Sequence, residues 1–266
     1  MASPGGGGGD RFKEPMNTGA REWDAATYDE VSDPQFEWGM EVLERLELRG
    51  DEVAVDAGCG SGRVTAELAR RLPAGRLIAV DGSTAMIEKA RERLGDRVAE
   101  YVVTDLAELE LAEPVDLVFS TATFHWIPDH DRLFRRIRTA LRPSGRLVAQ
   151  CGGAGNVASH TRAITAVAAR PKFAPHFSRA EGIWNFAGPE ETEERLRAAG
   201  FDRARCWLED KPVTPERPLE FISTVTVGPL LAQLPEELKR PFAEAILAES
   251  EQPLTLDYVR LNIEAS

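Results

Sequence analysis

The chain has 266 residues, enough for one large α/β domain with a full hydrophobic core. Its 44 acidic and 32 basic residues give a net charge of −12, which argues against nucleic acid as a main partner because such binding needs a basic surface. No apolar run approaches the roughly 20 residues of a membrane span, so no membrane partner is expected. The three cysteines (Cys59, Cys151 and Cys206) lack metal-ligand spacing and suit a reducing compartment. We therefore expect a cytoplasmic protein without a metal site.

The first 50 residues divide into two parts. Residues 1–20 contain a glycine run that cannot bury apolar surface, and we expect a disordered tail without a secretory signal. Residues 21–50 are predicted to form a helical N-terminal arm whose helix ends at Gly50. Trp23 and Tyr28 lie in this arm, where they either cover the surface of the domain or fold over a ligand.

The most informative stretch is residues 53–62, in which an apolar strand ends in the acid Asp56 and continues into three alternating glycines. Gly58 and Gly60 allow a tight turn and let a ligand approach the backbone closely. A helix that begins near Ser61 would point its unpaired N–H groups at this turn. The combination predicts the floor of a nucleotide-like pocket at the carboxyl end of a parallel sheet.

The rest of the chain alternates between strands and helices. Six further strands are predicted, over residues 77–80, 97–103, 115–120, 146–151, 201–208 and 254–263. This alternation indicates an α/β fold: a doubly wound, mostly parallel, seven-stranded sheet in one domain over residues 51–266. Residues 152–187 are too long for a plain connection and are predicted to form a substrate-side cap inserted after the fifth strand, with a helix over 157–169. Residues 218–250 are predicted to be mostly helical.

A second acid, Asp81, follows the second predicted strand about 20 residues beyond the glycine turn. This is the spacing at which a carboxylate reaches a ribose diol. Ser83 follows at a position where its side chain can cap the next helix.

These features resemble the class I S-adenosylmethionine (SAM)-dependent methyltransferases. Motifs in the order and spacing of that family carry the resemblance: residues 56–62, 81–87, 105, 124–130 and 141–147. Trp23 and Tyr28 in the arm, and the pair His125 and Trp126, are similar to the trans-aconitate and juvenile-hormone-acid branch of small-molecule methyltransferases. The resemblance implies a Rossmann-like fold and SAM as cofactor, with S-adenosylhomocysteine as its product and no metal.

The resemblance also implies a set of cofactor-binding residues: Trp23, Tyr28, Asp56, Gly58, Gly60, Arg63, Asp81, Gly82, Ser83, Met86, Thr104, Asp105, Leu106, Ser120, Thr121 and Trp126. In this set Asp56 would lie near the ammonium group, Asp81 would accept both ribose hydroxyls, and Asp105 would take the adenine amino group. Met86 would lie against the adenine or ribose, or fill the core. Trp126 would likewise pack on the cofactor or fill the core.

The acceptor is expected beside the loop that follows the fourth strand. His125 is the catalytic candidate: it either removes a proton from a hydroxyl acceptor, pairs with a carboxylate when protonated, or is structural. The candidates for contact with the substrate are Tyr28, His125, His160, His176 and Trp184. His130, which lies between two aspartates, is predicted to be exposed at the surface.

We therefore expect methyl transfer from SAM to a small molecule, with a carboxylate oxygen as the acceptor and an in-line displacement. A carboxylate is ionised at pH 7 and needs no general base, and alignment of the reactants can supply roughly 7–11 kcal/mol of the barrier. A hydroxyl, carbon or nitrogen acceptor, a protein acceptor, and a SAM-binding partner protein without activity are the alternatives. An NAD-dependent oxidoreductase is disfavoured, because the loop reads G-x-G-x-G rather than G-x-G-x-x-G and Asp56 would sit badly near a pyrophosphate. The protein is expected to be a monomer or a homodimer.

Overall fold

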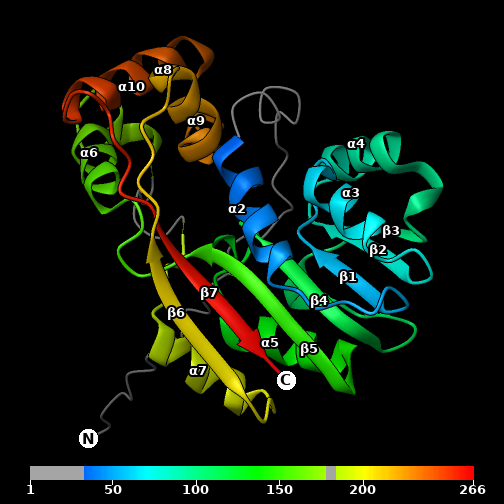
Figure 1. Cartoon of the computed structure of the whole chain (residues 1–266). Helices are drawn as coiled ribbons and strands as arrows, with labels where there is room; N and C mark the ends of the chain where they lie inside the picture. Colours follow the sequence, from blue (N-terminus) through cyan, green and yellow to red (C-terminus); the bar gives the residue numbers. More distant parts are fainter. Residues whose placement is uncertain (1–32, 178–183) are drawn as a thin grey trace, which may run out of the picture.

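The computed structural model describes residues 33–177 and 184–266. Seven strands form one sheet in the order β3-β2-β1-β4-β5-β7-β6 (Figure 1). Their bounds are β1 Val53–Ala57, β2 Arg76–Asp81, β3 Glu100–Val103, β4 Val115–Thr121, β5 Leu141–Gly152, β6 Ala204–Asp210 and β7 Val259–Ala265. Only β7 is reversed: it runs antiparallel to β5 and β6, while the remaining neighbours pair in parallel. The predicted doubly wound, mostly parallel sheet is confirmed.

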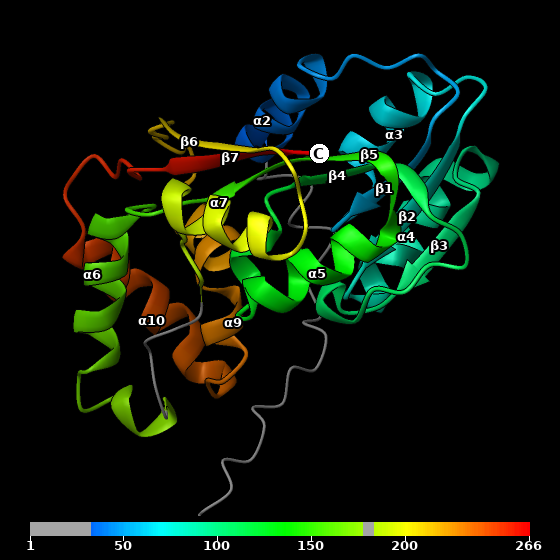
Figure 2. The same cartoon turned by 90° about the horizontal axis from the view of Figure 1, so that it is seen from below.

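Helices cover both faces of the sheet (Figure 2). The helices α2 (Asp33–Glu44), α3 (Arg63–Arg70) and α4 (Thr84–Leu94) pack on one face, and α5 (His130–Ala140) and α7 (Pro189–Ala198) pack on the other. Successive side chains of β1 point to opposite faces of the sheet. Ala54 packs in the first of these layers and Val55 in the second, and both are fully buried. Strands buried on both faces explain why the β1 sequence is apolar throughout until Asp56.

The remaining helices form a separate apolar cluster that we call the cap (Figure 1). It consists of α6 (Ala158–Ala168), α8 (Pro218–Phe221), a π-helical turn (Ile222–Thr226), α9 (Gly228–Leu231) and α10 (Glu236–Glu249). At its centre Phe242 is fully buried and meets the ring of Phe173 at a centroid distance of 5.1 Å. Trp38 of α2 belongs to the same cluster, so α2 packs against both the sheet and the cap.

Four 3₁₀ turns complete the described elements: Gly95–Arg97, Leu106–Glu108, Phe124–Trp126 and Ala174–His176. No helix in residues 33–177 or 184–266 is long and apolar enough to cross a bilayer.

Two predicted boundaries of helices and strands differ from those in the structure. The first described helix ends at Glu44 rather than at Gly50. The last strand begins at Val259 rather than near Leu254, because Leu254, Leu256 and Tyr258 are buried in the cap. The cap also draws on two separate parts of the chain, one after β5 and one between β6 and β7.

Candidate active site

The glycine loop ties β1 to β2 at the carboxyl edge of the sheet. The N–H groups of Gly58 and Cys59 both donate to the carbonyl of Val80, at 2.8 and 3.0 Å. Gly58 has φ of +86°, and a Cβ atom at this position would lie 2.0 Å from the hydroxyl of Thr123. Glycine is therefore required here both by the backbone conformation and by the side chain packed above it. At Gly60, by contrast, a Cβ atom would meet nothing within 4 Å, so the loop is open on that side.

Asp81 is held at the end of β2 by two backbone donors. Its Oδ2 accepts the N–H of Gly60 and its Oδ1 accepts the N–H of Ser83, both at 2.9 Å. These two bonds fix the orientation of the carboxylate. Ser83 is buried and caps α4 by accepting the N–H of Met86 at 3.3 Å. Met86 is buried in the first turn of the same helix.

Asp56 lies beneath the loop in a nearly closed site. It is 2% exposed, and its Oδ2 accepts a hydrogen bond from the hydroxyl of Thr65 at 2.7 Å. Burial raises the pKa of Asp56 to about 7, the hydroxyl of Thr65 opposes this shift, and the negative charge of Asp81 adds to it. A cation placed beside the two carboxylates would offset both the cost of burying the negative charge of Asp56 and its repulsion by Asp81.

The ends of β3 and β4 complete this edge of the sheet. The Thr104 N–H donates to the carbonyl of Asp81 at 3.0 Å. The Asp105 carboxylate caps the following 3₁₀ turn by accepting the N–H of Ala107 at 2.8 Å, and Leu106 is buried. Ser120 is buried and its hydroxyl donates to the carbonyl of Ala57 at 2.6 Å, which joins β4 to β1.

Three other predicted cofactor residues surround the loop. Gly82 follows β2 directly, and Thr121 is the last residue of β4. Arg63 opens α3, and its guanidinium lies 4.6 Å from the centre of the Phe36 ring, so it links α3 to α2. Trp23 and Tyr28 lie outside the described residues.

Aromatic rings gather beside the loop that follows β4. The ring of His125 lies 5.1 Å from Trp126 and 5.8 Å from Phe186, and Trp184 stacks on Phe186 at 5.5 Å with an interplanar angle of 13°. Trp126 and Trp184 also meet, at 6.0 Å. We call these four residues the aromatic cluster. It brings together His125, Trp126 and Trp184 from the predicted set, from two segments about 60 residues apart in sequence.

The protonation of His125 follows from one hydrogen bond. The backbone N–H of Gly152 donates to its Nδ1 at 3.2 Å. Because a backbone N–H can only donate, Nδ1 must act as an acceptor, and the neutral ring carries its proton on Nε2.

The other candidate histidines lie elsewhere. His160 is buried in the cap with its Nε2 at 2.9 Å from the hydroxyl of Thr226, and burial lowers its pKa to about 4. His176 ends a 3₁₀ turn that follows α6. The prediction that His130 is exposed is wrong: it is 2% exposed and its Nε2 hydrogen-bonds to the carbonyl of Phe124 at 2.9 Å. The helical repeat places it on the buried face of α5, with Phe134 and Ile137, despite its acidic neighbours.

Some residues of this edge carry no local sequence signal. Thr123 fills the space above Gly58, and Thr65 hydrogen-bonds to Asp56 from the first turn of α3. Phe186 reaches the aromatic cluster from the segment before α7. A helical i, i+4 pattern could not have found these contacts, because each joins elements that only the tertiary fold brings together.

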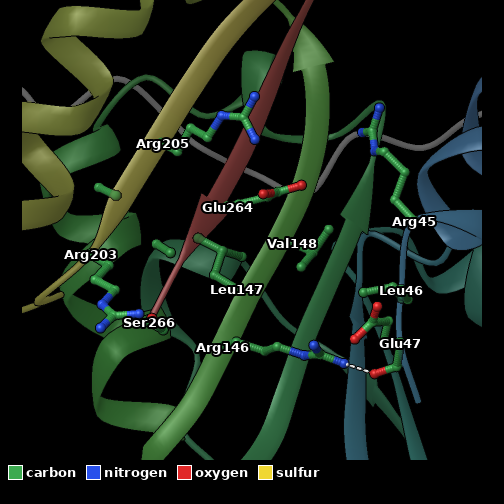
Figure 3. Close-up of a pocket in the computed structure, with 12 residues that line it drawn as sticks. Arg45, Leu46, Glu47, Arg146, Leu147, Val148, Arg203, Arg205, Glu264 and Ser266 are labelled. Atoms are coloured by element: carbon green, nitrogen blue, oxygen red, sulfur yellow. Dashed lines mark hydrogen bonds between the residues drawn. The ribbon is translucent and has the colours of Figure 1, made fainter.

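A hollow of about 400 Å³ lies at the opposite end of the sheet (Figure 3). Its walls include the middle of β5, the start of β6 and the end of β7. Its basic lining residues are Arg45, Arg146, Arg203 and Arg205. Ligands of doubly wound sheets bind at the carboxyl ends of the strands, and the glycine loop lies at that end, whereas this hollow lies at the other.

Comparison with known proteins agrees with this geometry. Residues 55–149 match the family model described as a methyltransferase domain. The chain is 29% identical over 241 residues to trans-aconitate 2-methyltransferase of Variovorax paradoxus, covering 89% of this chain and 90% of that one. It is 32% identical over 187 residues to trans-aconitate 2-methyltransferase of Methylobacterium nodulans, covering 70% and 67%. Among solved structures, phosphoethanolamine N-methyltransferase 2 of Haemonchus contortus, in complex with S-adenosylhomocysteine, shares the fold with a TM-score of 0.58 and 22% identity, covering 91% of this chain and 56% of that one.

The sheet order, the glycine loop after β1 and the acid after β2 are those of a class I SAM-dependent methyltransferase. The chain belongs to this family, in the small-molecule group that contains the trans-aconitate 2-methyltransferases. Its cofactor is SAM and its reaction is methyl transfer to a small molecule.

The residues at the carboxyl edge fit this cofactor. The open side of the loop at Gly60 leaves room for it, Asp81 presents a fixed carboxylate for a diol, and Asp56 offers a buried acid for an ammonium group. When bound there, SAM would supply a methyl group on a positively charged sulfur. The acceptor would bond to this carbon as the carbon–sulfur bond breaks and leaves its electron pair on sulfur.

Proposed function

We propose that the protein transfers the methyl group to a carboxylate oxygen of a small organic acid, giving a methyl ester. The observation that carries this proposal is the hydrogen bond from the Gly152 N–H to Nδ1 of His125. A ring in this state has its proton on Nε2, so it can donate a hydrogen bond but cannot also remove a proton with the same atom. A carboxylate acceptor suits such a site, because it is already ionised at pH 7.

The aromatic cluster supports the same acceptor. Its rings exclude water from the region beside His125, which is 8% exposed. When a carboxylate attacks a sulfonium, opposite charges cancel in the transition state, so a dry site favours the reaction. Within this proposal the rings of His125, Trp126 and Trp184 surround the space in which the acceptor binds. The names of the relatives from Variovorax and Methylobacterium agree with an acid as the acceptor.

We also propose that the cofactor contacts follow the sequence motifs. Asp81 would take the ribose hydroxyls, Asp105 with the Leu106 N–H would take the adenine edge, and Asp56 would pair with the ammonium group.

The test is transfer from methyl-labelled SAM to panels of carboxylic acids, phenols, amines and activated carbon acids. We expect label in a product that releases methanol on mild alkaline hydrolysis, as a methyl ester does. At saturating SAM, kcat should stay flat between pH 6 and 9, since no proton is removed. Label that survives alkali in a phenol or an amine product, or a kcat that rises with pH, would contradict a carboxylate acceptor.

A further inference from the structure

Four arginines surround the hollow of about 400 Å³ that lies away from the glycine loop, and Figure 3 shows them on different sides of it. They come from the segment after α2, the middle of β5 and the start of β6 with the residue before it: Arg45, Arg146, Arg203 and Arg205. In a chain with a net charge of −12, composition does not explain such a concentration of positive charge. A hollow lined in this way attracts anions.

The register of the sheet explains why these side chains converge. Val148 of β5, Glu264 of β7 and Arg205 of β6 form one row across three neighbouring strands. Side chains of paired residues point to the same face of a sheet, and so do side chains two positions apart along a strand. Arg146 and Arg203 lie two positions before Val148 and Arg205, so they share this face, which is the face that α2 covers further along.

Two of the four guanidiniums are held in place by one aromatic ring. The guanidinium of Arg45 lies 5.3 Å from the centre of the Trp207 ring, and that of Arg205 lies 4.7 Å from it. Arg45 is fixed further because its Nη2 donates to Oδ1 of Asn262 at 2.6 Å. Side chains that are already ordered lose less entropy when a ligand binds.

None of the four guanidiniums forms an ion pair within residues 33–177 and 184–266. Arg146, for example, donates through Nη2 to the backbone carbonyl of Glu47. Arg142, four residues earlier on β5, is by contrast paired with the carboxylate of Asp116. The arginines of the hollow therefore keep charged donors that an anion can use.

The lining of the hollow also favours an anion of more than one charge. Its arginines outnumber its acidic side chains, Glu47 and Glu264, and would still do so with a terminal carboxylate on Ser266. Guanidinium forks bind phosphate through parallel hydrogen bonds. A volume of about 400 Å³ is that of a small-molecule pocket, and arginines on different sides of such a space suit a diphosphate better than a single phosphate.

We propose that this hollow is a second ligand site, which binds a small molecule through a diphosphate group. The apolar side chains of Leu46, Leu147 and Val148 also line it and leave room for an organic part of the ligand. The site is separate from the glycine loop and does not depend on which acceptor the enzyme methylates.

The experiment is calorimetry on the protein saturated with S-adenosylhomocysteine, with inorganic pyrophosphate, orthophosphate and ADP as probes. We expect saturable binding of pyrophosphate, about tenfold tighter than that of orthophosphate. The double variant Arg203→Gln and Arg205→Gln should lose about tenfold or more in affinity for pyrophosphate. The matched control is Arg135→Gln with Arg162→Gln, which removes the same charge from exposed positions of α5 and α6 outside the hollow and should bind as the wild type does.

A wild-type protein that shows no saturable binding of pyrophosphate would overturn the inference. So would a folded hollow variant with wild-type affinity, or an equal loss in both double variants, which would report net charge alone. If the glutamine variant does not fold, Arg203→Lys with Arg205→Lys decides: it keeps the charge but loses the planar forks, so we expect weaker binding, and unchanged affinity overturns the inference. ADP separates the sources of the group, because tighter binding than that of pyrophosphate supports an organic diphosphate and weaker binding supports the free anion.

Discussion

At the scale of single residues, two acids with different surroundings define the cofactor edge. Asp81 is partly exposed, and its two carboxylate oxygens each accept a backbone N–H group. Asp56 is buried with one hydroxyl donor, and burial raises its pKa. We therefore propose two roles for the same residue type: Asp81 as a fixed acceptor for hydroxyl groups and Asp56 as a buried partner for a cation.

Asp81→Ala should weaken binding of S-adenosylhomocysteine at least tenfold. The change removes two charge-assisted hydrogen bonds to the ribose, each worth about 1.5–3 kcal/mol. Asp96→Ala, at an exposed acid on the turn after α4, is the control and should bind normally. Calorimetry gives both affinities, and thermal unfolding checks that each variant is folded. Unchanged affinity in Asp81→Ala would remove the assignment of the ribose to this acid.

Binding of S-adenosylhomocysteine should strengthen as the pH rises from 6 to 8. The pKa of Asp56 without ligand is about 7, so this carboxyl is mostly protonated at pH 6 and mostly ionised at pH 8. Only the ionised form attracts an ammonium group, and the affinity should increase by about tenfold across this range. Asp56→Asn should bind more weakly at pH 8 and show a flat profile. A wild-type profile that is flat, or that falls with pH, would contradict the pairing.

At the scale of elements, the glycine loop shows why the sequence predicts this part of the site well. Its strand, acid, turn and helix are consecutive in the chain, so the sequence pattern of one short stretch is enough to predict them. Phe186 has no such signal, because the segment before α7 brings it to the aromatic cluster from more than 120 residues beyond the glycine loop. The prediction for His130 is wrong for a different reason. Its acidic neighbours suggested that the side chain is exposed to solvent, whereas the helical repeat places its ring in the core.

Replacement of two glycines of the loop should affect different properties, the stability at Gly58 and the ligand affinity at Gly60. Gly58→Ala would place its Cβ atom 2.0 Å from the Thr123 hydroxyl with φ at +86°, and should lower the free energy of unfolding by about 1–3 kcal/mol or more. Gly60→Ala meets no atom within 4 Å, so it should fold with a smaller loss but bind S-adenosylhomocysteine more weakly.

Gly95→Ala is the matched control for Gly60→Ala. Gly95 has φ of +51° against +54° for Gly60, and its Cβ would also meet nothing within 4 Å. Both positions have a positive φ without a steric neighbour, so a difference in ligand affinity between the two folded variants reports on the loop. Equal affinities for the two variants, measured by calorimetry, would mean that the cofactor does not approach Gly60.

At the scale of the whole molecule, the sheet and the cap have separate apolar cores. The residues proposed to bind the cofactor lie at the ends of β1 to β4, whereas the cap has its own apolar core around Phe242. The alternation of strands and helices predicted the sheet correctly, including its mostly parallel character. The pattern did not predict that helices 218–249 join α6 in one cluster, because such contacts depend on how two distant segments pack.

Phe242→Ala should disturb acceptor binding more than cofactor binding. Removal of a fully buried phenylalanine costs about 3–5 kcal/mol of stability, and the loss should loosen the cap. We expect a raised KM for the acceptor and an unchanged affinity for S-adenosylhomocysteine. Phe134→Ala, equally buried but under the sheet, should weaken both. Loss of cofactor affinity in a folded Phe242→Ala variant would argue against independent roles for the two parts.

The central claim is that the methyl donor binds across the carboxyl ends of the first strands, at the glycine loop and its two acids. The most direct measurement is a crystal structure with S-adenosylhomocysteine. We predict the ribose hydroxyls on Asp81, the amino group beside Asp56 and the adenine next to Asp105. Ligand density in the arginine-lined hollow at the other end of the sheet, with the glycine loop empty, would contradict the account.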